Sequence, residues 1–231
     1  SILNKLGFFP VIIHGGGKRI SIELEANGIK SDFINGIRVT DQKSISIVDE
    51  VLNIFNKEIT DALKKNGCGS QSISNKEQNI ISVKQENKDL GYVGIPCNID
   101  KSIIDKIVNE KKVPVIAPLG LDENNIVYNI NADTAAGAIA KKLKARRLII
   151  MSDVEGVLDD KKKLISEINT NQINELIKNR TISGGMIPKI NNCLDVASNG
   201  VKGVCIIDGR LNHSILYELL SDKGSGTLIR L

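Results

Sequence analysis

The stretch Pro10–Ile20, PVIIHGGGKRI, decides the fold class that the sequence predicts. It indicates a short aliphatic strand that ends at His14. Three glycines then lead into a predicted helix with apolar residues at Ile20, Leu24 and Ala26. Glycines let a backbone approach a ligand closely, and the N–H groups at a helix start can hold an anion. The spacing matches neither GxxxxGK[ST] nor GxGxxG, so neither a P-loop nor a dinucleotide-binding turn is indicated.

The same order of strand and helix continues along the 231 residues. Further strands are predicted at 79–85, 91–100, 113–120, 146–153, 203–208 and 226–230. Further helices are predicted at 46–67, 101–112, 132–145, 172–180, 188–200 and 213–224. We expect 79–85 to pair antiparallel and 226–230 to form an edge strand. The alternation predicts an α/β fold, a three-layer αβα sandwich with a central, mainly parallel sheet.

The amino-acid composition limits the classes of function that the chain can have. Hydrophobic residues make up 41% and aromatic residues only 3%, which favours an aliphatic core of buried parallel strands. The net charge of +4 is too small to indicate nucleic-acid binding. No apolar run reaches the length of a membrane span, and no signal peptide opens the chain. Four cysteines without a CxxC pair, beside two histidines, favour free thiols in a reducing compartment over a zinc site.

Four clusters rich in glycine or acidic residues follow predicted strands: HGGGK, LGLDENN, SDVEGV and DGR. Each alone is also what an ordinary strand-to-helix turn looks like. The carboxyl ends of parallel strands share one edge of a sheet, where ligands bind in open α/β folds. Four such clusters at one edge therefore favour a ligand site.

Two further segments carry unusual polar residues. Asn129, Asn131 and Asp133 alternate, and in an extended segment they would share one face, although Asp133 could instead cap the next helix. Lys189 lies where a helix begins, and a cation there opposes the helix dipole. Lys189 is therefore either a functional cation or a side chain that simply extends into solvent.

Together these motifs resemble the amino acid kinase family, and within it the N-acetylglutamate kinases. The resemblance covers the chain from about residue 2 to its end. It rests on segments that occur in the family's order: HGGG, NGIRVTD, LGYVG, VPVIAPLG, YNINADTAAGAIA, SDVEGVLDD, ISGGMIPK, IIDGR and GSGT. NGIRVTD, YNINADTAAGAIA and GGMIPK are the most specific of these.

The resemblance implies roles for individual residues. Gly16 and Gly17 are expected to offer backbone donors, and Arg38 and Asn129 to bind the substrate. Lys189 is expected to stabilise the phosphoryl group in flight, and Asp133 to orient the catalytic lysines. The residues expected to bind the nucleotide are Asp153, Gly156, Val157, Leu158, Thr181, Ile182 and Ser183.

The implied reaction is phosphorylation of the γ-carboxylate of N-acetyl-L-glutamate by ATP, the second step of arginine biosynthesis. Mg²⁺ is expected to be held mainly by the nucleotide, with no metal-binding residues of the protein. A carboxylate nucleophile is already ionised at neutral pH, so the protein needs to position the reactants and stabilise charge, without a general base. The sequence also leaves open another amino acid kinase, such as glutamate 5-kinase, or a catalytically impaired relative that senses arginine.

The chain departs from the family pattern at three places. The family begins with a Lys-Gly-Gly strand, and the opening SILNKLGFFP is typical of a helix end, so we expect a segment upstream of Ser1. Ser74–Asn79, SNKEQN, corresponds to a lid-like hairpin over the substrate in relatives but lacks its turn glycines, so we expect a hairpin of different shape here. Cys205 replaces the histidine common in arginine-inhibited relatives, although Glu218 and the segment 224–227 match their arginine-binding region.

The expected organisation is a single amino acid kinase domain over 1–231. Its lobe 1–117 would bind the substrate and dimerise, and its lobe 118–231 would bind ATP. A homodimer or hexamer is implied, with arginine as a possible inhibitor and, as in some photosynthetic relatives, the PII signalling protein as a possible partner. The cytoplasm or the plastid stroma is the expected location.

Overall fold

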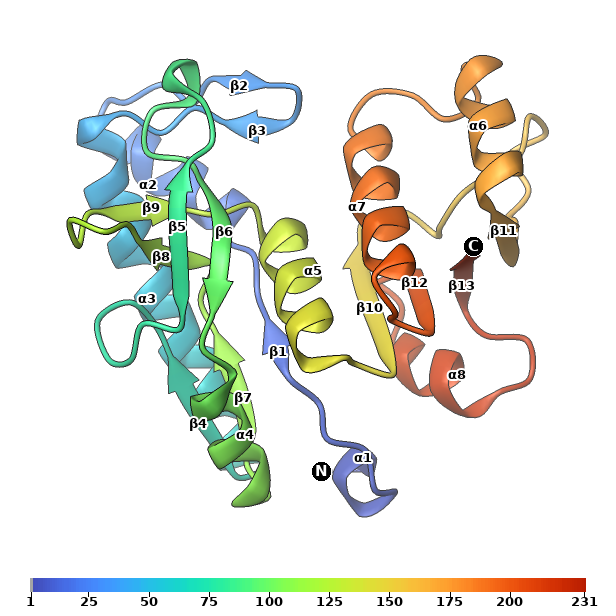
Figure 1. Ribbon diagram of the computed structural model, residues 1–231, viewed down its shortest axis with the longest axis horizontal. Coiled ribbons are helices and arrows are strands. Elements are labelled where there is room, and N and C mark those ends of the chain that lie inside the picture. The colour runs from blue at the N-terminus through green and yellow to red at the C-terminus, as the bar shows by residue number, and fades with distance from the viewer. Residues whose placement is uncertain (1) are drawn as a thin grey trace. The chain divides into compact units, whose positions relative to one another are not determined.

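A computed structural model describes residues 2–231 of the chain (Figure 1). The chain divides within helix α5 (Ala132–Leu143) into two compact units, Ser1–Ala135 and Ala136–Leu231. This division lies later than the one predicted after residue 117. The roles assigned to the two lobes stay predictions.

The first unit contains a parallel sheet of three strands in the order β1 (Ile12–Ile13), β7 (Val113–Ile116) and β4 (Ser70–Ile73). A mixed sheet has the order β6 (Gly94–Ile99), β5 (Ile81–Gln85), β8 (Leu119–Leu121) and β9 (Val127–Asn129). Strands β2 (Phe33–Ile34) and β3 (Ile37–Arg38) form a hairpin. Strand β5 pairs antiparallel with β6, as predicted for 79–85.

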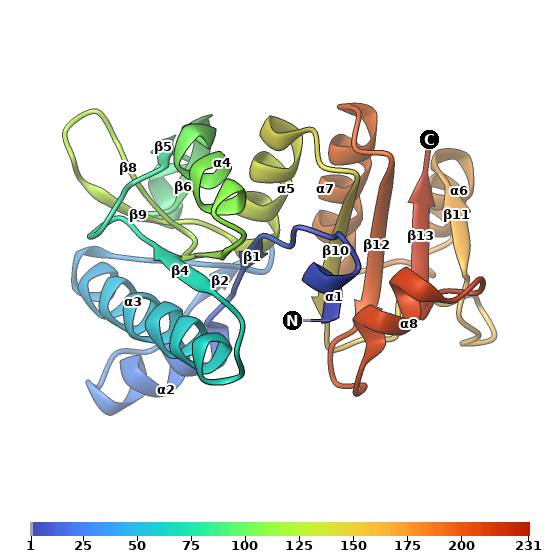
Figure 2. The same cartoon turned by 90° about the horizontal axis from the view of Figure 1, so that it is seen from below.

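The helices of the first unit are α1 (Ile2–Lys5), α2 (Gly17–Ala26), α3 (Gln42–Lys65) and α4 (Lys101–Asn109), with a 3-10 turn at Lys88–Leu90. Helices α3 and α4 lie on opposite faces of β4 and β7, as Figures 1 and 2 both show. Asp41 caps α3 by accepting a hydrogen bond from the Ser44 N–H at 2.8 Å. Gly67, at φ 72°, follows the helix end where the sequence predicted it.

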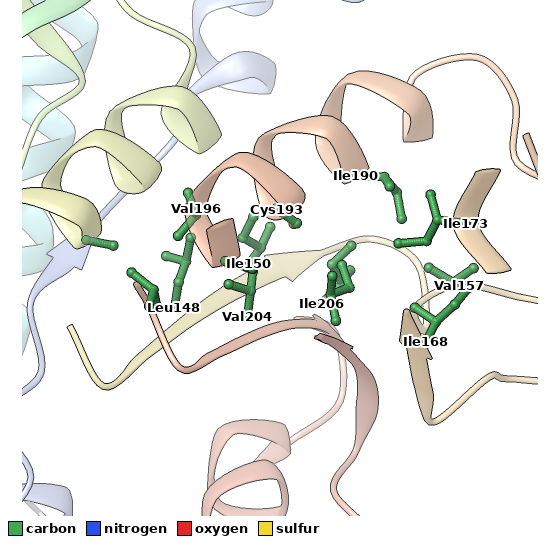
Figure 3. Packing of buried hydrophobic residues seen from close by; sticks show 14 of the residues in the cluster. Leu148, Ile150, Val157, Ile168, Ile173, Ile190, Cys193, Val196, Val204 and Ile206 are labelled. Atoms are coloured by element: carbon green, nitrogen blue, oxygen red, sulfur yellow. The ribbon is translucent and has the colours of Figure 1, made fainter. Parts of the chain in front are cut away.

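The second unit contains one sheet in the order β10 (Arg147–Ser152), β12 (Gly203–Asp208), β13 (Gly226–Arg230) and β11 (Glu167–Asn169). Its helices are the second part of α5, α6 (Thr170–Lys178), α7 (Met186–Ser198) and α8 (Ser214–Leu220). Helices α7 and α8 lie on opposite faces of β12 (Figures 2 and 3). Each unit is therefore layered as helix, sheet and helix, which confirms the predicted α/β class.

The core of the second unit is almost wholly aliphatic, as the composition predicted. Ile190, Cys193 and Val196 project from α7 toward β10 and β12 (Figure 3). All six residues of β12 are buried, which suits a run without polar alternation. Packing of these side chains holds the carboxyl ends of β10 and β12 side by side, with Ser152 paired to Asp208.

Three sequence predictions are wrong in detail. Segment 226–230 is not an edge strand, because β13 pairs with β12 on one side and β11 on the other. Segment Ser74–Asn79 is not a hairpin tip, because it joins β4 and β5, which belong to different sheets. The face proposed for Asn129, Asn131 and Asp133 is interrupted, because β9 ends at Asn129 and α5 begins at Ala132.

Candidate active site

A cavity of about 190 Å³ lies in the first unit, beside the carboxyl ends of β1 and β7. Its walls combine backbone of the glycine segment, one cation, two asparagines and several aliphatic side chains. The lining residues are Gly15, Gly16, Gly17, Ile20, Phe33, Gly36, Ile37, Arg38, Leu52, Pro118, Asn129, Ile130, Asn131 and Ala132. Four predicted substrate-binding residues, Gly16, Gly17, Arg38 and Asn129, therefore line one cavity.

The glycine segment joins β1 to α2. Gly16 precedes the first turn of α2, and its carbonyl accepts the Ile20 N–H at 2.9 Å. A Cβ at Gly16 would lie 2.7 Å from the Leu52 side chain of α3, so a larger residue would disturb the packing. The absence of side chains brings backbone N–H groups of a helix start to the cavity wall, where they suit an anion.

Arg38 supplies the cation of the cavity and is only 7% exposed. Its Nη1 donates to the Ser31 hydroxyl, and its Nη2 donates to Ser21 Oγ and the Gly17 carbonyl, both at 2.9 Å. The guanidinium also lies 4.7 Å from the centre of the Phe33 ring. Burial lowers the pKa of Arg38, although a guanidinium remains charged in proteins.

Asn129 is held beside Arg38 by a chain of hydrogen bonds. Its Nδ2 donates to Thr40 Oγ1 at 3.2 Å, and Thr40 Oγ1 donates to the Arg38 carbonyl at 3.2 Å. Thr40 is fully buried. This link fixes the end of β9 against β3, and so places an amide and a guanidinium on the same cavity.

The first turn of α5 is capped by Asn131, whose Oδ1 accepts the N–H groups of Asp133 at 3.0 Å and Thr134 at 3.1 Å. The alternative in which Asp133 is the cap is therefore wrong. Asp133 is half-buried in the first helical turn, and it belongs to the first unit. Lys189, the fourth residue of α7, belongs to the second unit, so the predicted partnership of these two residues stays a prediction.

The cations next to the glycines do not line the cavity. Arg19 pairs with Glu58 of α3 at 2.7 Å, and its guanidinium lies 4.0 Å from the centre of the Phe55 ring. Lys18 is exposed on the same helix. The cation of the cavity comes from β3 instead.

The predicted nucleotide-binding residues lie in two segments of the second unit. In the first segment, the Val157 N–H donates to the buried Thr227 Oγ1 at 2.8 Å, and Thr227 Oγ1 donates to the Ile165 carbonyl at 2.7 Å. Gly156 has φ 146°, and a Cβ there would lie 2.8 Å from the Leu164 side chain. These contacts explain why a glycine is needed at this turn.

Val157 and Ile182 belong to one buried cluster, so the structure brings the two segments onto a common core. Leu158 pairs with Leu164 across a short antiparallel bridge. Asp153 and Ser183 are exposed, and Thr181 is half-buried. Contact of these residues with a nucleotide stays a prediction.

The sequence did not predict the hydroxyls that hold Arg38 and Asn129, on Ser21, Ser31 and Thr40. Thr40 lies in the motif NGIRVTD, which could have indicated it, but Ser21 and Ser31 carry no signal that distinguishes them from surface serines. Their contacts with Arg38 identify them.

In the second unit, several polar groups lie around Glu218 of α8. Its carboxylate accepts the Ser225 N–H at 2.8 Å and lies 3.5 Å from Arg147 Nη1, while Glu218 itself is 7% exposed. Burial, followed by a hydrogen bond with Glu218, raises the pKa of Cys205 to about 12. Glu218 and Ser225, which match an arginine-binding region, are thus neighbours of Cys205, which departs from it.

Comparison with known proteins identifies the class. A family model described as "Amino acid kinase family" matches residues 1–208. The chain belongs to the amino acid kinase family. It is a kinase, an enzyme that uses ATP.

Similar proteins within the family include acetylglutamate kinases. The chain is 66% identical to the acetylglutamate kinase of Pelagibacter ubique over 229 residues, 99% of this chain and 80% of that one. It is 45% identical to the acetylglutamate kinase of Campylobacter fetus, covering 99% of this chain and 82% of that one. These relatives confirm the predicted resemblance.

Solved structures support the fold. The structure of smu.665 from Streptococcus mutans aligns with a TM-score of 0.83 at 32% identity, over 95% of this chain and 85% of that one. An N-acetylglutamate synthase from Neisseria gonorrhoeae, complexed with coenzyme A and N-acetyl-glutamate, aligns with a TM-score of 0.89 at 21% identity. That alignment covers this whole chain and 54% of the synthase, and it bears on the fold alone. In the described part of the chain, no helix is long and apolar enough to cross a membrane.

Proposed function

We propose that this kinase transfers the γ-phosphoryl group of ATP to the γ-carboxylate of N-acetyl-L-glutamate, giving N-acetyl-L-glutamyl 5-phosphate for arginine biosynthesis. The main support for this proposal is the buried Arg38, which lies in a cavity that also offers glycine N–H groups and the Asn129 amide. A guanidinium forms strong, charge-assisted hydrogen bonds with a carboxylate, and an amide suits the N-acetyl group. Aliphatic walls at Ile20 and Leu52 suit the methylene chain and the methyl group.

Each of the predicted site residues has a separate proposed role. Arg38 and Asn129 hold the substrate, and the N–H groups of Gly16 and Gly17 face its reacting carboxylate. Lys189 stabilises the negative charge of the transferring phosphoryl group, with Asp133 orienting it. Such charge stabilisation and positioning supply most of the rate enhancement in phosphoryl transfer.

The nucleotide is proposed to lie against the segments at 153–158 and 181–183. Mg²⁺ would be carried by the phosphates of ATP, where it neutralises charge. In residues 2–231, no three His, Cys, Asp or Glu side chains gather as a metal site.

The test is a coupled ADP-release assay with ATP and Mg²⁺. N-acetyl-L-glutamate should be phosphorylated, and glutamate should be a far poorer substrate because it lacks the amide that Asn129 recognises. The names of the relatives also favour the acetylated substrate over that of a glutamate 5-kinase. Equal turnover of both substrates would contradict the proposal.

Feedback inhibition by arginine is a further part of the proposal. The Glu218 carboxylate is buried and already accepts a backbone N–H from the loop at Ser225. A ligand guanidinium could replace the long contact with Arg147. The assay above, repeated with added arginine, tests this, and a Glu218→Gln variant should lose any inhibition.

Assembly as a homodimer or hexamer is proposed from the family resemblance, and light scattering measures it. Adding a PII signalling protein to the same sample tests that partner. The bacterial sources of the relatives favour the cytoplasm over a plastid stroma.

A further inference from the structure

Helix α3 buries polar side chains at positions where an amphipathic helix ordinarily buries apolar ones. The side of α3 that faces the protein interior carries Val48, Leu52, Asn56 and Thr60, and each of these residues is at most 2% exposed. The first two are aliphatic, and the last two are polar. Burying an amide is unfavourable unless hydrogen bonds replace those made with water, so the contacts of Asn56 are informative.

The Asn56 amide contacts two strands and the residue that follows a third. Its Nδ2 donates to the Val115 carbonyl of β7 at 3.0 Å, and lies 3.4 Å from the Ile73 carbonyl of β4. It also lies 3.2 Å from Nε2 of His14, the residue that follows β1. One side chain thus ties together the carboxyl ends of β1, β7 and β4, beside the glycine segment.

The orientation of this amide is determined by its neighbours. Two of them are carbonyl oxygens, which only accept, so the NH₂ group must face them. The Asn56 Oδ1 is then left buried without a hydrogen-bond partner among the described residues. A buried amide that leaves its own oxygen unpaired in order to direct its N–H groups calls for an explanation beyond packing.

His14 transmits this constraint to the glycine segment. Its Nδ1 lies 3.0 Å from the Gly15 carbonyl, so Nδ1 carries the hydrogen and Nε2 accepts from Asn56. The ring is 7% exposed and packs edge-on against Phe55 at 5.1 Å. Burial, the largest cause, lowers the pKa of His14, and the charge of Arg19 lowers it further, against the hydrogen bond to Gly15. The imidazole is therefore neutral, as this arrangement requires.

We propose that Asn56 is a positioning residue for phosphoryl transfer: through His14 it fixes the Gly15 carbonyl, and so directs the N–H groups of Gly16 and Gly17 into the cavity. Three consecutive glycines have no side chains with which to hold their own conformation. The segment therefore depends on an anchor outside it. This inference rests on the proposed function for its kinetic consequence, and on geometry alone for its structural one.

Nitrogen NMR of the imidazole rings tests the geometry without any activity. The chain has two histidines, and a His213→Gln variant assigns the signals. In the wild-type protein, His14 should carry its hydrogen on Nδ1 and have an unprotonated Nε2 at neutral pH. A proton on Nε2 would overturn the inference.

Kinetics test the functional consequence with Asn56→Leu, which keeps similar side-chain bulk without the amide. We expect kcat and kcat/KM to fall together by about 10²-fold, because misplaced donors weaken the transition state. Thr60→Val is the matched control, since Thr60 is equally buried one turn along α3 and its hydroxyl donates to the Asn56 carbonyl at 2.8 Å. It should lose comparable stability and keep its turnover.

Wild-type turnover by a folded Asn56→Leu protein, or an equal loss of turnover in Thr60→Val, would refute the positioning role. If Asn56→Leu does not fold, the wild-type NMR measurement still decides. A wild-type protein that does not phosphorylate N-acetylglutamate would instead contradict the proposed substrate, and would leave the His14 result intact.

Discussion

Replacing Arg38 by lysine is the sharpest test of the substrate site. In the structure the guanidinium donates three hydrogen bonds to Ser31, Ser21 and the Gly17 carbonyl. An arginine carries five N–H donors, which leaves two for a ligand. A lysine ammonium has three donors in a compact tetrahedral group, so it cannot hold these partners and a carboxylate together.

The expected loss follows from those contacts. A hydrogen bond to a charged group contributes about 1.5–3 kcal/mol. Losing one such bond to the substrate carboxylate corresponds to roughly 10- to 150-fold in kcat/KM. Because the proposed contact of Arg38 with a carboxylate would exist in the ground state and the transition state alike, the loss should fall mainly on KM.

The assay is steady-state ADP release at varied N-acetyl-L-glutamate, with saturating ATP and Mg²⁺. Arg19→Lys is the matched control, because Arg19 is a neighbouring arginine whose ion pair with Glu58 lies outside the cavity lining. It should leave KM nearly unchanged. If Arg38→Lys keeps the wild-type KM, or Arg19→Lys raises it as much, the assignment of Arg38 is wrong.

Three further predictions concern charge stabilisation, backbone strain and titration. Lys189→Ala should keep its circular dichroism spectrum but lose about 10²–10³-fold in kcat, the usual effect of removing a preorganised donor, and near-normal turnover would contradict its role. Gly91→Ala should unfold at lower urea than Gly67→Ala: both glycines have positive φ, but a Cβ at Gly91 would overlap the Thr40 carbonyl, whereas nothing lies within 4 Å at Gly67. Because the pKa of Cys205 is raised to about 12, the folded state keeps a proton that the unfolded state loses above about pH 9. The contribution of Cys205 should therefore lower the free energy of unfolding by about 1.4 kcal/mol per pH unit between about pH 9 and about pH 12. Urea titrations of Cys205→Val over this pH range should lack that contribution.

The sequence predicted those helices and strands whose own residues show a clear pattern, and it failed where the structure depends on residues far away in the chain. The strand at 203–208 was predicted correctly because a run of buried aliphatic residues needs no partner to be recognised. The predicted strand 113–120 is only partly right, because β7 ends at Ile116 and Leu119–Leu121 forms β8 in another sheet. The two-residue strands β2 and β3 were missed, because two residues show no periodicity. The interior position of β13 was mistaken for an edge, because strand order is set by pairing with residues distant in the chain.

The candidate site was predictable where glycines and charges mark it, and unpredictable where neutral polar residues support it. Helical periodicity in the sequence predicts that the apolar residues Phe55 and Ile59 lie on the buried face of α3. Both are half-exposed, and the polar residues Asn56 and Thr60 are buried beside Val48 and Leu52. A polar residue at a core position looks like a surface residue until its partners are known. Only the contacts of Asn56 with carbonyl groups of β4 and β7 identify it as a buried polar residue.

The charge of Arg38 gives the strongest physical reason to expect an anionic ligand in the cavity. Its partners are two hydroxyls and a carbonyl, all neutral, and within residues 2–231 no carboxylate pairs with it. Arg19 and Arg210, by contrast, have Glu58 and Asp208 as counter-ions. Burying an uncompensated charge is costly, and dipoles offset only part of that cost. A carboxylate entering the cavity would complete the compensation, so we expect an anionic ligand that binds there to stabilise the fold.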